Sequence, residues 1–288
     1  MVAPRLPGLL AALILAAPIA PAFADQSPPQ MAAAGHLRVL PLAGGQNFRD
    51  LGGYQTINGR TVRWSILFRS GSMHFLTPDD YAYLDRLGIR TVCDFRDVRE
   101  RRLEPAQWPD GKAPRMLFDD YVLDSSGIGL AAANGEPTAA QARAAFIHFY
   151  PQLLATFNGQ YRRMFGELLA GRVPLAFNCT AGKDRTGIAA ALVLTALGVP
   201  RATVIEDYAL SNRYFDPAKV VRSNEASATD WSKVPPDVIK VYMAADPGYI
   251  EAVLALMDAH KDGVDGYLRD ELGLTTAKRR LLEARYTR

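Results

Sequence analysis

The 288-residue sequence has only two cysteines, Cys93 and Cys179. They could form at most one disulfide, which excludes a scaffold held by several disulfides, and they are too few for an all-cysteine zinc site. The sequence also lacks a large excess of charge of one sign, since it has 33 Lys and Arg and 30 Asp and Glu. A surface that follows a nucleic acid usually has a far larger basic excess, so the net charge of +3 argues against such a partner.

Long apolar runs are lacking after the N-terminus. There, Arg5 precedes an apolar run over 9–17, and Ala22-Phe23-Ala24 has the small-x-small pattern of a cleavage site. A membrane anchor is the alternative, but Pro18 ends a run shorter than the roughly 20 residues that span a bilayer. We predict a signal peptide over 1–24 and an exported protein, periplasmic or secreted, with no stable membrane span.

Three apolar runs in the remaining chain predict β-strands, at 63–68, 89–95 and 173–178. Helical patterns separate them, and strands flanked by helices favour a mostly parallel sheet that is buried on both faces. No internal repeat or domain boundary is visible. We therefore predict an α/β fold with a single domain over 36–288, after a polar and Ala-rich linker over 25–35.

Helix signals are clearest after the first strand. Thr77 is an N-cap hydroxyl followed by proline and two acids, and it begins a helix that ends at Gly88. The pattern over 138–170 predicts two helices with a break near Asn158-Gly159. Gly, Ala and Asp are frequent over 119–137, which indicates a long loop. Further helices are expected at 185–197, at 202–214 and over most of the C-terminal region.

The chemistry is concentrated in residues 177–187, FNCTAGKDRTG. Cys179 follows the end of a buried strand, and Arg185, after five intervening residues, opens an Ala-rich helix. Such a loop directs backbone N–H groups at one point near a helix N-terminus, which makes an anion site. A cysteine at its base is favoured as the thiolate by these amides, by the helix dipole and by Lys183 and Arg185.

The Cys-x5-Arg spacing suits phosphoryl chemistry. A nucleophile must lie beneath a bound phosphorus while a planar guanidinium grips two of its oxygens from the side. The Thr186 hydroxyl is expected to hydrogen-bond the sulfur of Cys179. A nucleotide-binding P-loop would need glycine at Phe177 and Ser or Thr at Asp184, so that alternative fails. Cys179 could instead be a buried packing residue. A strand, the Cys-x5-Arg-Thr-Gly motif and a helix follow one another in that order, however, and this succession argues against a packing role.

This loop resembles the signature of the cysteine-dependent phosphatases. Its Ala-Gly-Lys-Asp-Arg core is similar to an atypical bacterial branch of secreted, broad-specificity tyrosine and lipid phosphatases. The resemblance spans roughly 45–285, and the further motifs that carry it are Asn47–Gly53 (NFRDLGG), Phe68–Gly71, Gly88-Ile89, Asp94–Arg96, Asp207-Tyr208, Ser211-Asn212 and Tyr267–Arg269.

The resemblance implies roles for the loop residues. Cys179 would form a phospho-cysteine and Arg185 would bind the phosphate and stabilise the transition state, without a metal or cofactor. Lys183 would add positive charge at the rim. The remaining phosphate-binding residues would be Thr180, Ala181, Gly182, Thr186 and Gly187.

The general acid is left open between two carboxyls. The resemblance favours Asp184, inside the loop, as the acid or as a residue that positions water. Asp94 is the alternative, at the end of a strand where α/β sites collect, although it could instead form an ion pair with Arg96 or Arg99. Arg49 and Asp50 of the N-terminal motif also have two interpretations: they lie near the site, or they form a structural salt bridge under a Gly-Gly turn.

Three further features are notable. The family usually has His before the nucleophile, and Asn178 stands there instead, so we expect less thiolate near neutral pH. Cys93 could form a reversible disulfide with Cys179, or it could be a packing thiol. Helices over 213–260 are where the resemblance places a lid, and their apolar stripe is expected to be a core or lid face: Ile250, Val253, Leu254, Leu256 and Met257.

The sequence therefore predicts a phosphomonoester hydrolase of the protein tyrosine or dual-specificity type. Its substrate would be a phosphorylated protein. The alternative is a phospholipid or inositol phosphate, because a cationic Lys183 beside Arg185 would suit a multiply phosphorylated head group. A phosphate-binding module without catalysis is a third hypothesis, suggested by Asn178.

Overall fold

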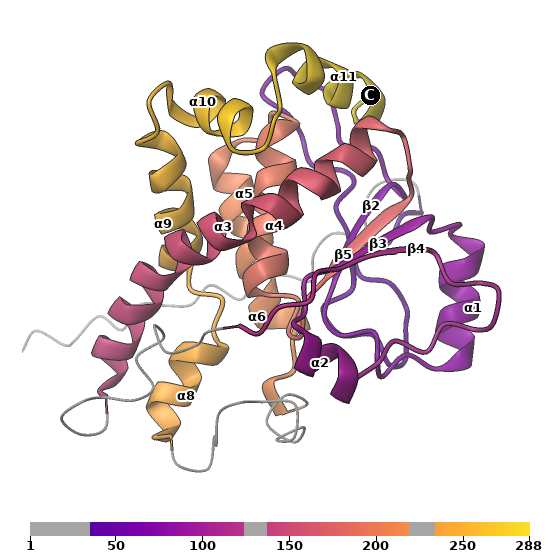
Figure 1. Cartoon of the computed structure of the whole chain (residues 1–288), viewed down its shortest axis with the longest axis horizontal. Helices are drawn as coiled ribbons and strands as arrows, with labels where there is room; N and C mark the ends of the chain where they lie inside the picture. Colours follow the sequence, from indigo (N-terminus) through magenta and orange to yellow (C-terminus); the bar gives the residue numbers. More distant parts are fainter. Residues whose placement is uncertain (1–34, 124–136, 219–233) are drawn as a thin grey trace, which may run out of the picture. The chain divides into compact units, whose positions relative to one another are not determined.

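The computed structural model describes residues 35–123, 137–218 and 234–288 (Figure 1). The predicted signal peptide and nearly all of the 25–35 linker lie outside these residues, as does most of the loop expected over 119–137. All of the described residues belong to one unit of the chain, Ala32–Arg288.

A five-stranded sheet in the order β1-β2-β5-β3-β4 positions the site. β2 (Leu67–Ser70), β5 (Leu175–Asn178), β3 (Thr91–Asp94) and β4 (Arg115–Leu117) are parallel, whereas the two-residue β1 (Arg49–Asp50) is antiparallel to β2. The mostly parallel α/β sheet predicted from the sequence is confirmed. Ser70, Asn178 and Asp94 are in register at the carboxyl ends of β2, β5 and β3.

β2 begins later than the sequence predicts. Ser65 has a positive φ of 62°, a conformation that breaks an extended run, and its N–H donates to Asp50 Oδ2 at 2.7 Å. The strand pairing therefore starts only at Leu67. β1 and β4 were not predicted, because strands of two and three residues are too short to show a periodic pattern.

Alternate side chains of the central strands enter two separate cores. Phe68, Val92 and Ala176 pack on one face, against α1 (Pro78–Arg86). Leu67, Cys93 and Phe177 pack on the opposite face, with α3 (Ala139–Leu169) and α4 (Asp184–Ala196). Figure 1 shows α1 on one side of β2, β5 and β3, and α3 with α4 on the other. Burial of both faces explains why these strands are apolar throughout.

The predicted start of α1 is confirmed by its capping box. The Thr77 side chain accepts from the Asp80 N–H at 3.2 Å, and the Asp80 carboxylate accepts from the Thr77 N–H at 2.9 Å. The helix ends before Gly88, whose φ of 68° suits glycine.

α3 corrects the sequence prediction, because it is one continuous helix with no break near Asn158-Gly159. The Asn158 side chain donates to Glu271 and accepts from the hydroxyl of Tyr267, so a residue that usually favours turns is held in the helix by tertiary contacts. The cost of Gly159, about 1 kcal/mol relative to alanine, is small beside the burial of this helix against the core.

The C-terminal region is helical, as expected. α5 (Arg201–Ala209) and α6 (Ser211–Tyr214) replace the single helix predicted over 202–214. The other helices are α2 (Val98–Leu103), α8 (Pro236–Met243), α9 (Pro247–Asp258), α10 (Gly263–Asp270) and α11 (Thr276–Tyr286).

The stripe on α9 is a core face. Ile250, Val253, Leu254 and Met257 are buried in the core that includes α3 and α4, and Leu256 is partly buried. Within the predicted lid region, residues 219–233 lie outside the described residues. None of the helices in the described parts of the chain has the length and apolar character that crossing a bilayer requires.

Candidate active site

The loop from Cys179 to Arg185 connects the carboxyl end of β5 to α4. Cys179 begins the loop and is 1% exposed. The amide N–H groups from Thr180 to Arg185 donate to no acceptor within 35–123, 137–218 and 234–288. A run of amides at a helix N-terminus with no protein acceptor is suited to bind an anion with several oxygens.

The carbonyl oxygens of the same loop are held from outside. The Asn47 side chain donates to the carbonyl oxygens of Ala181 and Gly182, at 3.2 and 2.9 Å. The Arg69 guanidinium donates to Gly182 O at 2.8 Å, and the Ser72 N–H donates to the carbonyl oxygen of Thr180 at 2.8 Å. Since these carbonyls are fixed outward, the amides keep their orientation without an anion.

Gly182 is required at the point where the loop meets the end of β2. Its φ is 67°, and a Cβ there would lie 2.5 Å from the carbonyl oxygen of Ser70. Gly187 is required for a different reason, because a Cβ there would lie 2.8 Å from the ring of Tyr208 on α5. Any larger residue at either position would displace the loop or the helix that follows it.

A buried ion cluster supports Asn47 and Arg69. Arg49 donates to the Asn47 side-chain oxygen and, at 2.9 Å, to the carbonyl oxygen of Asp207, while Arg69 pairs with the Asp207 carboxylate at 2.5 Å. Burial opposes ionisation of Asp207, but Arg69 and Arg49 outweigh it and lower the pKa of this carboxyl. Arg49 therefore supports the loop through Asn47. Its ion pair is with Asp207 rather than with Asp50.

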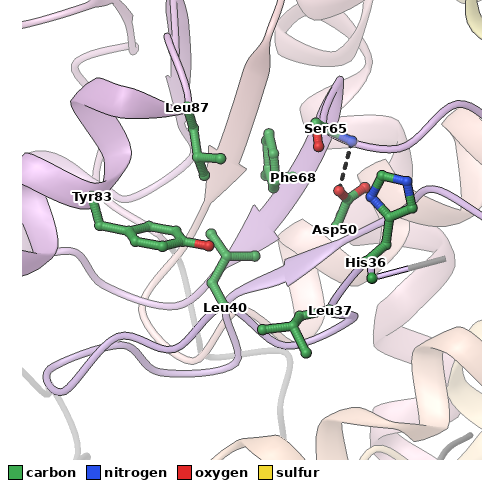
Figure 2. Close-up of a pocket in the computed structure, with 9 residues that line it drawn as sticks. His36, Leu37, Leu40, Asp50, Ser65, Phe68, Tyr83 and Leu87 are labelled. Carbon is green, nitrogen blue, oxygen red and sulfur yellow. Dashed lines mark hydrogen bonds between the residues drawn. The ribbon is translucent and has the colours of Figure 1, made fainter. Parts of the chain in front are cut away.

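Asp50 lies apart from the loop. Its carboxylate accepts from the N–H groups of Gly52 and Ser65, each at 2.7 Å, so it stabilises a turn. It also lines a pocket of about 160 Å³ beside His36 and Phe68 (Figure 2). No residue from 179 to 187 lines this pocket. Asp50 thus has a structural role at the turn, but the salt bridge with Arg49 that was its structural alternative is not formed, because Arg49 pairs with Asp207.

The Arg185 guanidinium is gripped at one end by Glu100 of α2. Nη1 and Nη2 each donate to one carboxylate oxygen at 2.7 Å, and Nη1 also donates to the carbonyl oxygen of Phe95 at 3.0 Å and to the Tyr121 hydroxyl at 2.8 Å. Burial raises the pKa of Glu100, but the Arg185 charge dominates and brings it to about 2. Glu100 is therefore a permanent anion that fixes the direction of Arg185.

The opposite edge of Arg185 keeps its donors. Nε donates to no acceptor among the described residues, and the contacts of Nη2 are Glu100 and, at a long 3.5 Å, the Thr180 hydroxyl. A guanidinium has five N–H groups in a rigid fork, so the Nε and Nη2 edge can still bind two oxygens of one phosphate. The ion pair with Glu100 therefore orients the Arg185 guanidinium and leaves N–H donors on its Nε and Nη2 edge for a phosphate.

Asp184 presents one oxygen to the protein and one away from it. Its Oδ1 accepts from the Tyr150 hydroxyl and, at 2.8 Å, from the Lys183 ammonium. Its Oδ2 accepts no hydrogen bond from the described residues, and the side chain is 27% exposed. Asp184 is thus placed in the loop with one carboxyl oxygen able to exchange a proton.

Lys183 does not lie at the rim, and the expectation that it adds charge there is wrong. Its side chain is 2% exposed, and its ammonium donates to Asp184 and to the carbonyl oxygens of Tyr242 and Ala244, at 2.9 and 3.0 Å. All three N–H donors are therefore used within the protein. Lys183 connects the loop to the end of α8.

Asp94 forms the ion pair that was its alternative role. The Arg96 guanidinium donates to both of its oxygens, with the shortest contact at 2.7 Å, and the Asn178 amide donates to Oδ1 at 3.1 Å. Asp94 is 3% exposed, so neither oxygen is available for proton transfer to a bound substrate.

The Thr186 hydroxyl also differs from the expectation. Its hydrogen bond is to the carbonyl oxygen of Ser70, at 3.5 Å, and the described residues show none to the sulfur of Cys179. Within the same residues, no three His, Cys, Asp or Glu side chains are grouped so as to hold a metal ion.

Comparison with known proteins shows the family of this chain. A sequence model described as the tyrosine phosphatase family matches residues 40–288. The chain belongs to this family. A relative from Cupriavidus necator, whose name places it among the tyrosine-protein phosphatases, is 33% identical over 242 residues and covers 81% of this chain and 84% of its own.

The triple specificity protein phosphatase PtpB of Mycobacterium tuberculosis is 31% identical to this phosphatase, over 81% of this chain and 94% of its own. Among solved structures, TpbA of P. aeruginosa is similar over 66% of this chain and 96% of that chain, at 18% identity and a TM-score of 0.29.

Sequence reasoning missed two residues of this phosphatase that hold Arg185. Glu100 is separated from Arg185 by 85 positions in the chain, and Tyr121 by 64. One signal could have found Glu100: it forms a capping box with Asp97 that places it in the first turn of α2, directly after the strand β3 that leads to the site. Tyr121 lies in the segment 119–137, for which the sequence predicts only a loop.

The two cysteines are both free thiols. The parallel register places Cys93 beside Phe177, which precedes Cys179 by two residues, or about 6.6 Å of strand rise. Burial raises the pKa of Cys93 to about 12, so this thiol is inert at neutral pH. The contacts therefore support the packing role of Cys93, and the described structure contains no Cys93–Cys179 disulfide.

Replacing Asn178 by His should increase the thiolate fraction of Cys179. The amide of Asn178 already contacts the Asp94 carboxylate, and a carboxylate there would favour a protonated imidazole next to the nucleophile. We expect iodoacetamide to alkylate Cys179 faster in Asn178→His than in the wild type at mildly acidic pH, because the thiolate is the form that reacts. Asn178→Gln is the neutral control. An alkylation rate for Asn178→His equal to that of the wild type would refute a role for the missing charge.

Proposed function

We propose that this phosphatase is exported and hydrolyses phosphotyrosine in proteins through a phosphate ester of the Cys179 sulfur. The observation that carries the proposal is the combination at one loop: a cysteine at its base, amides from Thr180 to Arg185 without acceptors among the described residues, and an Arg185 edge with unused donors. Together these provide a nucleophile and an oxyanion-binding shell around one phosphate.

The first step breaks the ester bond. The Cys179 thiolate attacks phosphorus, the P–S bond forms, and the P–O bond to the leaving group breaks. The loop amides and the free edge of Arg185 hold the three non-bridging oxygens as charge moves onto them. Asp184 gives its proton to the leaving oxygen, so that an alcohol or phenol departs rather than an alkoxide or phenoxide.

The second step restores the enzyme. Water attacks the phosphorus, the now ionised Asp184 takes a proton from it, and the P–S bond breaks to release inorganic phosphate and the Cys179 thiolate. Asp184 is proposed for both transfers because its Oδ2 has no protein partner among the described residues. Asp94 is not proposed, because Arg96 and Asn178 occupy its oxygens.

The choice of phosphotyrosine is supported by two features. Lys183, which had suggested a multiply phosphorylated head group, has no donor left for a second phosphate. Phe118 and Val122 are about half exposed on the segment whose Tyr121 contacts Arg185, and such apolar side chains suit an aromatic ring. The triple specificity named for the Mycobacterium tuberculosis relative supports testing other phosphoesters as well.

A substrate panel tests the proposal. In excess EDTA, the purified protein should hydrolyse p-nitrophenyl phosphate, because none of its proposed steps uses a metal. Among natural phosphoesters we expect the highest kcat/KM for a phosphotyrosine peptide, by about tenfold over phosphothreonine peptides. Phosphate release from each peptide, and from vesicles that contain phosphatidylinositol phosphates, is the measurement.

Two outcomes would contradict the proposal in different ways. A higher kcat/KM on the phosphoinositide vesicles would keep the chemistry and change the substrate class. Binding of phosphate without turnover of any substrate would instead favour the binding module. Export is tested separately, by N-terminal sequencing of the protein recovered outside the cytoplasm, which should begin at Asp25.

A further inference from the structure

Tyr150 of α3 contributes a buried hydroxyl to the loop that the sequence did not single out. The side chain is fully buried, its hydroxyl donates to Asp184 Oδ1, and the hydroxyl of Tyr208 lies 2.5 Å from it. Because the single proton of Tyr150 is directed at the carboxylate, Tyr208 must be the donor in the contact between the two hydroxyls.

These hydroxyls are held in the protonated form near neutral pH. Burial, followed by the nearby Asp184 carboxylate, raises the pKa of both Tyr150 and Tyr208 well above the ordinary value. A phenol that stays protonated supplies a fixed donor. The Lys183 ammonium adds a second donor to the same Asp184 oxygen, at 2.8 Å.

The arrangement treats the two oxygens of Asp184 unequally. Oδ1 accepts two hydrogen bonds, whereas Oδ2 accepts none from the described residues. A proton on Oδ1 would displace a donor, so Oδ2 is the oxygen that can exchange a proton with a bound molecule. The chain of hydroxyls therefore selects which oxygen is protonated and prevents the carboxyl from rotating.

We propose that Tyr150, backed by Tyr208, is a positioning residue that holds Asp184 Oδ1 so that Oδ2 delivers the proton to the leaving oxygen. In the second step the same contact leaves Oδ2 as the atom that takes the proton from water. This inference rests on the proposed role of Asp184 as the general acid. It assigns Tyr150 no contact with substrate.

Tyr150→Phe removes only the hydroxyl. The ring keeps its contacts with Phe146 and Tyr249, at centroid distances of 5.8 and 5.2 Å. Tyr286→Phe is the matched control, because Tyr286 is also buried and its hydroxyl donates to the carbonyl oxygen of Leu168. That contact lies roughly 18 residues, or about 27 Å, further along α3 than Tyr150.

The experiment compares aryl phosphates whose leaving groups differ in basicity. A good leaving group such as p-nitrophenolate needs little help from an acid, whereas phenolate needs a proton. For Tyr150→Phe we expect kcat/KM, which reports the first step and not the hydrolysis of the phospho-cysteine, to fall about tenfold on phenyl phosphate and less than about twofold on p-nitrophenyl phosphate. Tyr208→Phe should show a smaller effect of the same kind, and Tyr286→Phe none.

A double variant separates positioning from packing. Since Tyr150 acts through Asp184, adding Tyr150→Phe to Asp184→Asn should cause no further loss of kcat/KM. An equal loss of kcat/KM on both substrates, or a further loss in the double variant, would overturn the inference. If Asp184→Asn itself shows no dependence on the leaving group, the proposed acid is wrong and this inference falls with it. If only Tyr150→Phe lacks that dependence, the proposed function stands and the inference fails alone.

Discussion

Cys179→Ser should abolish hydrolysis of p-nitrophenyl phosphate, with a loss of kcat of at least about 10⁴-fold. The serine hydroxyl is isosteric with the thiol but is almost never ionised at neutral pH, so no strong nucleophile remains beneath the phosphorus. The loop amides and Arg185 do not depend on the sulfur for their geometry. The variant should therefore still bind a phosphotyrosine peptide, which isothermal titration calorimetry can measure.

Cys93→Ser is the matched control for the loss of Cys179. Cys93 is the only other cysteine of the chain and is buried on the neighbouring strand β3. It should keep kcat within about twofold of the wild type, because its thiol takes no part in the reaction. Residual activity in Cys179→Ser comparable to that of Cys93→Ser would remove Cys179 from the mechanism.

Arg185→Lys should have the second largest effect, a loss of about 10³-fold in kcat/KM. An ammonium is a point charge without a fork, so lysine cannot grip two oxygens of one phosphate. It also cannot satisfy Glu100, the carbonyl of Phe95 and the Tyr121 hydroxyl in the same geometry as the guanidinium. Steady-state kinetics on p-nitrophenyl phosphate, with inorganic phosphate as a competing ligand, would measure the change. A loss below about tenfold would mean that charge alone is sufficient at this position.

Glu100→Gln tests the support behind Arg185. The amide keeps the size of the carboxylate but not its charge, so we expect kcat/KM to fall about tenfold as the fork loses its direction. Because the pKa of Glu100 is lowered from 4.5 to about 2, the stabilising charge is fully present above about pH 4.5 and is lost as the pH falls toward 2. The difference in unfolding free energy between Glu100→Gln and the wild type should therefore be largest at neutral pH and narrow in acid. A difference that is independent of pH would exclude the ion pair as its cause.

The features that could be predicted well from the sequence are those that depend on residues close together in the chain. The Cys-x5-Arg loop and the helix that begins after Thr77 depend on neighbours within a few residues, and both are found where expected. The parallel strands followed from apolar runs that are buried on both faces. The active-site loop could be predicted because a strand, a loop and a helix N-terminus are consecutive in the chain.

Contacts between distant segments could not be predicted in the same way. Glu100, Tyr121 and Tyr150 reach the loop from three different elements, and no spacing in the chain reveals them. Lys183 was misplaced for the same reason: the sequence gives its charge, but not the carbonyl oxygens at the end of α8 that bury it. The break expected near Asn158-Gly159 failed because tertiary contacts outweighed local turn preference.

The central claim is that a phosphate is transferred to the sulfur of Cys179. Mixing the protein with a fast substrate, quenching in acid within milliseconds and mapping the peptides by mass spectrometry tests this directly. We expect a single phosphorylated peptide, the one that contains Cys179. The amount of this peptide should rise in Asp184→Asn, because the account has that carboxyl activate the water in the second step. A phosphate attached to another residue, or turnover with no phosphorylated peptide at any quench time, would contradict the account.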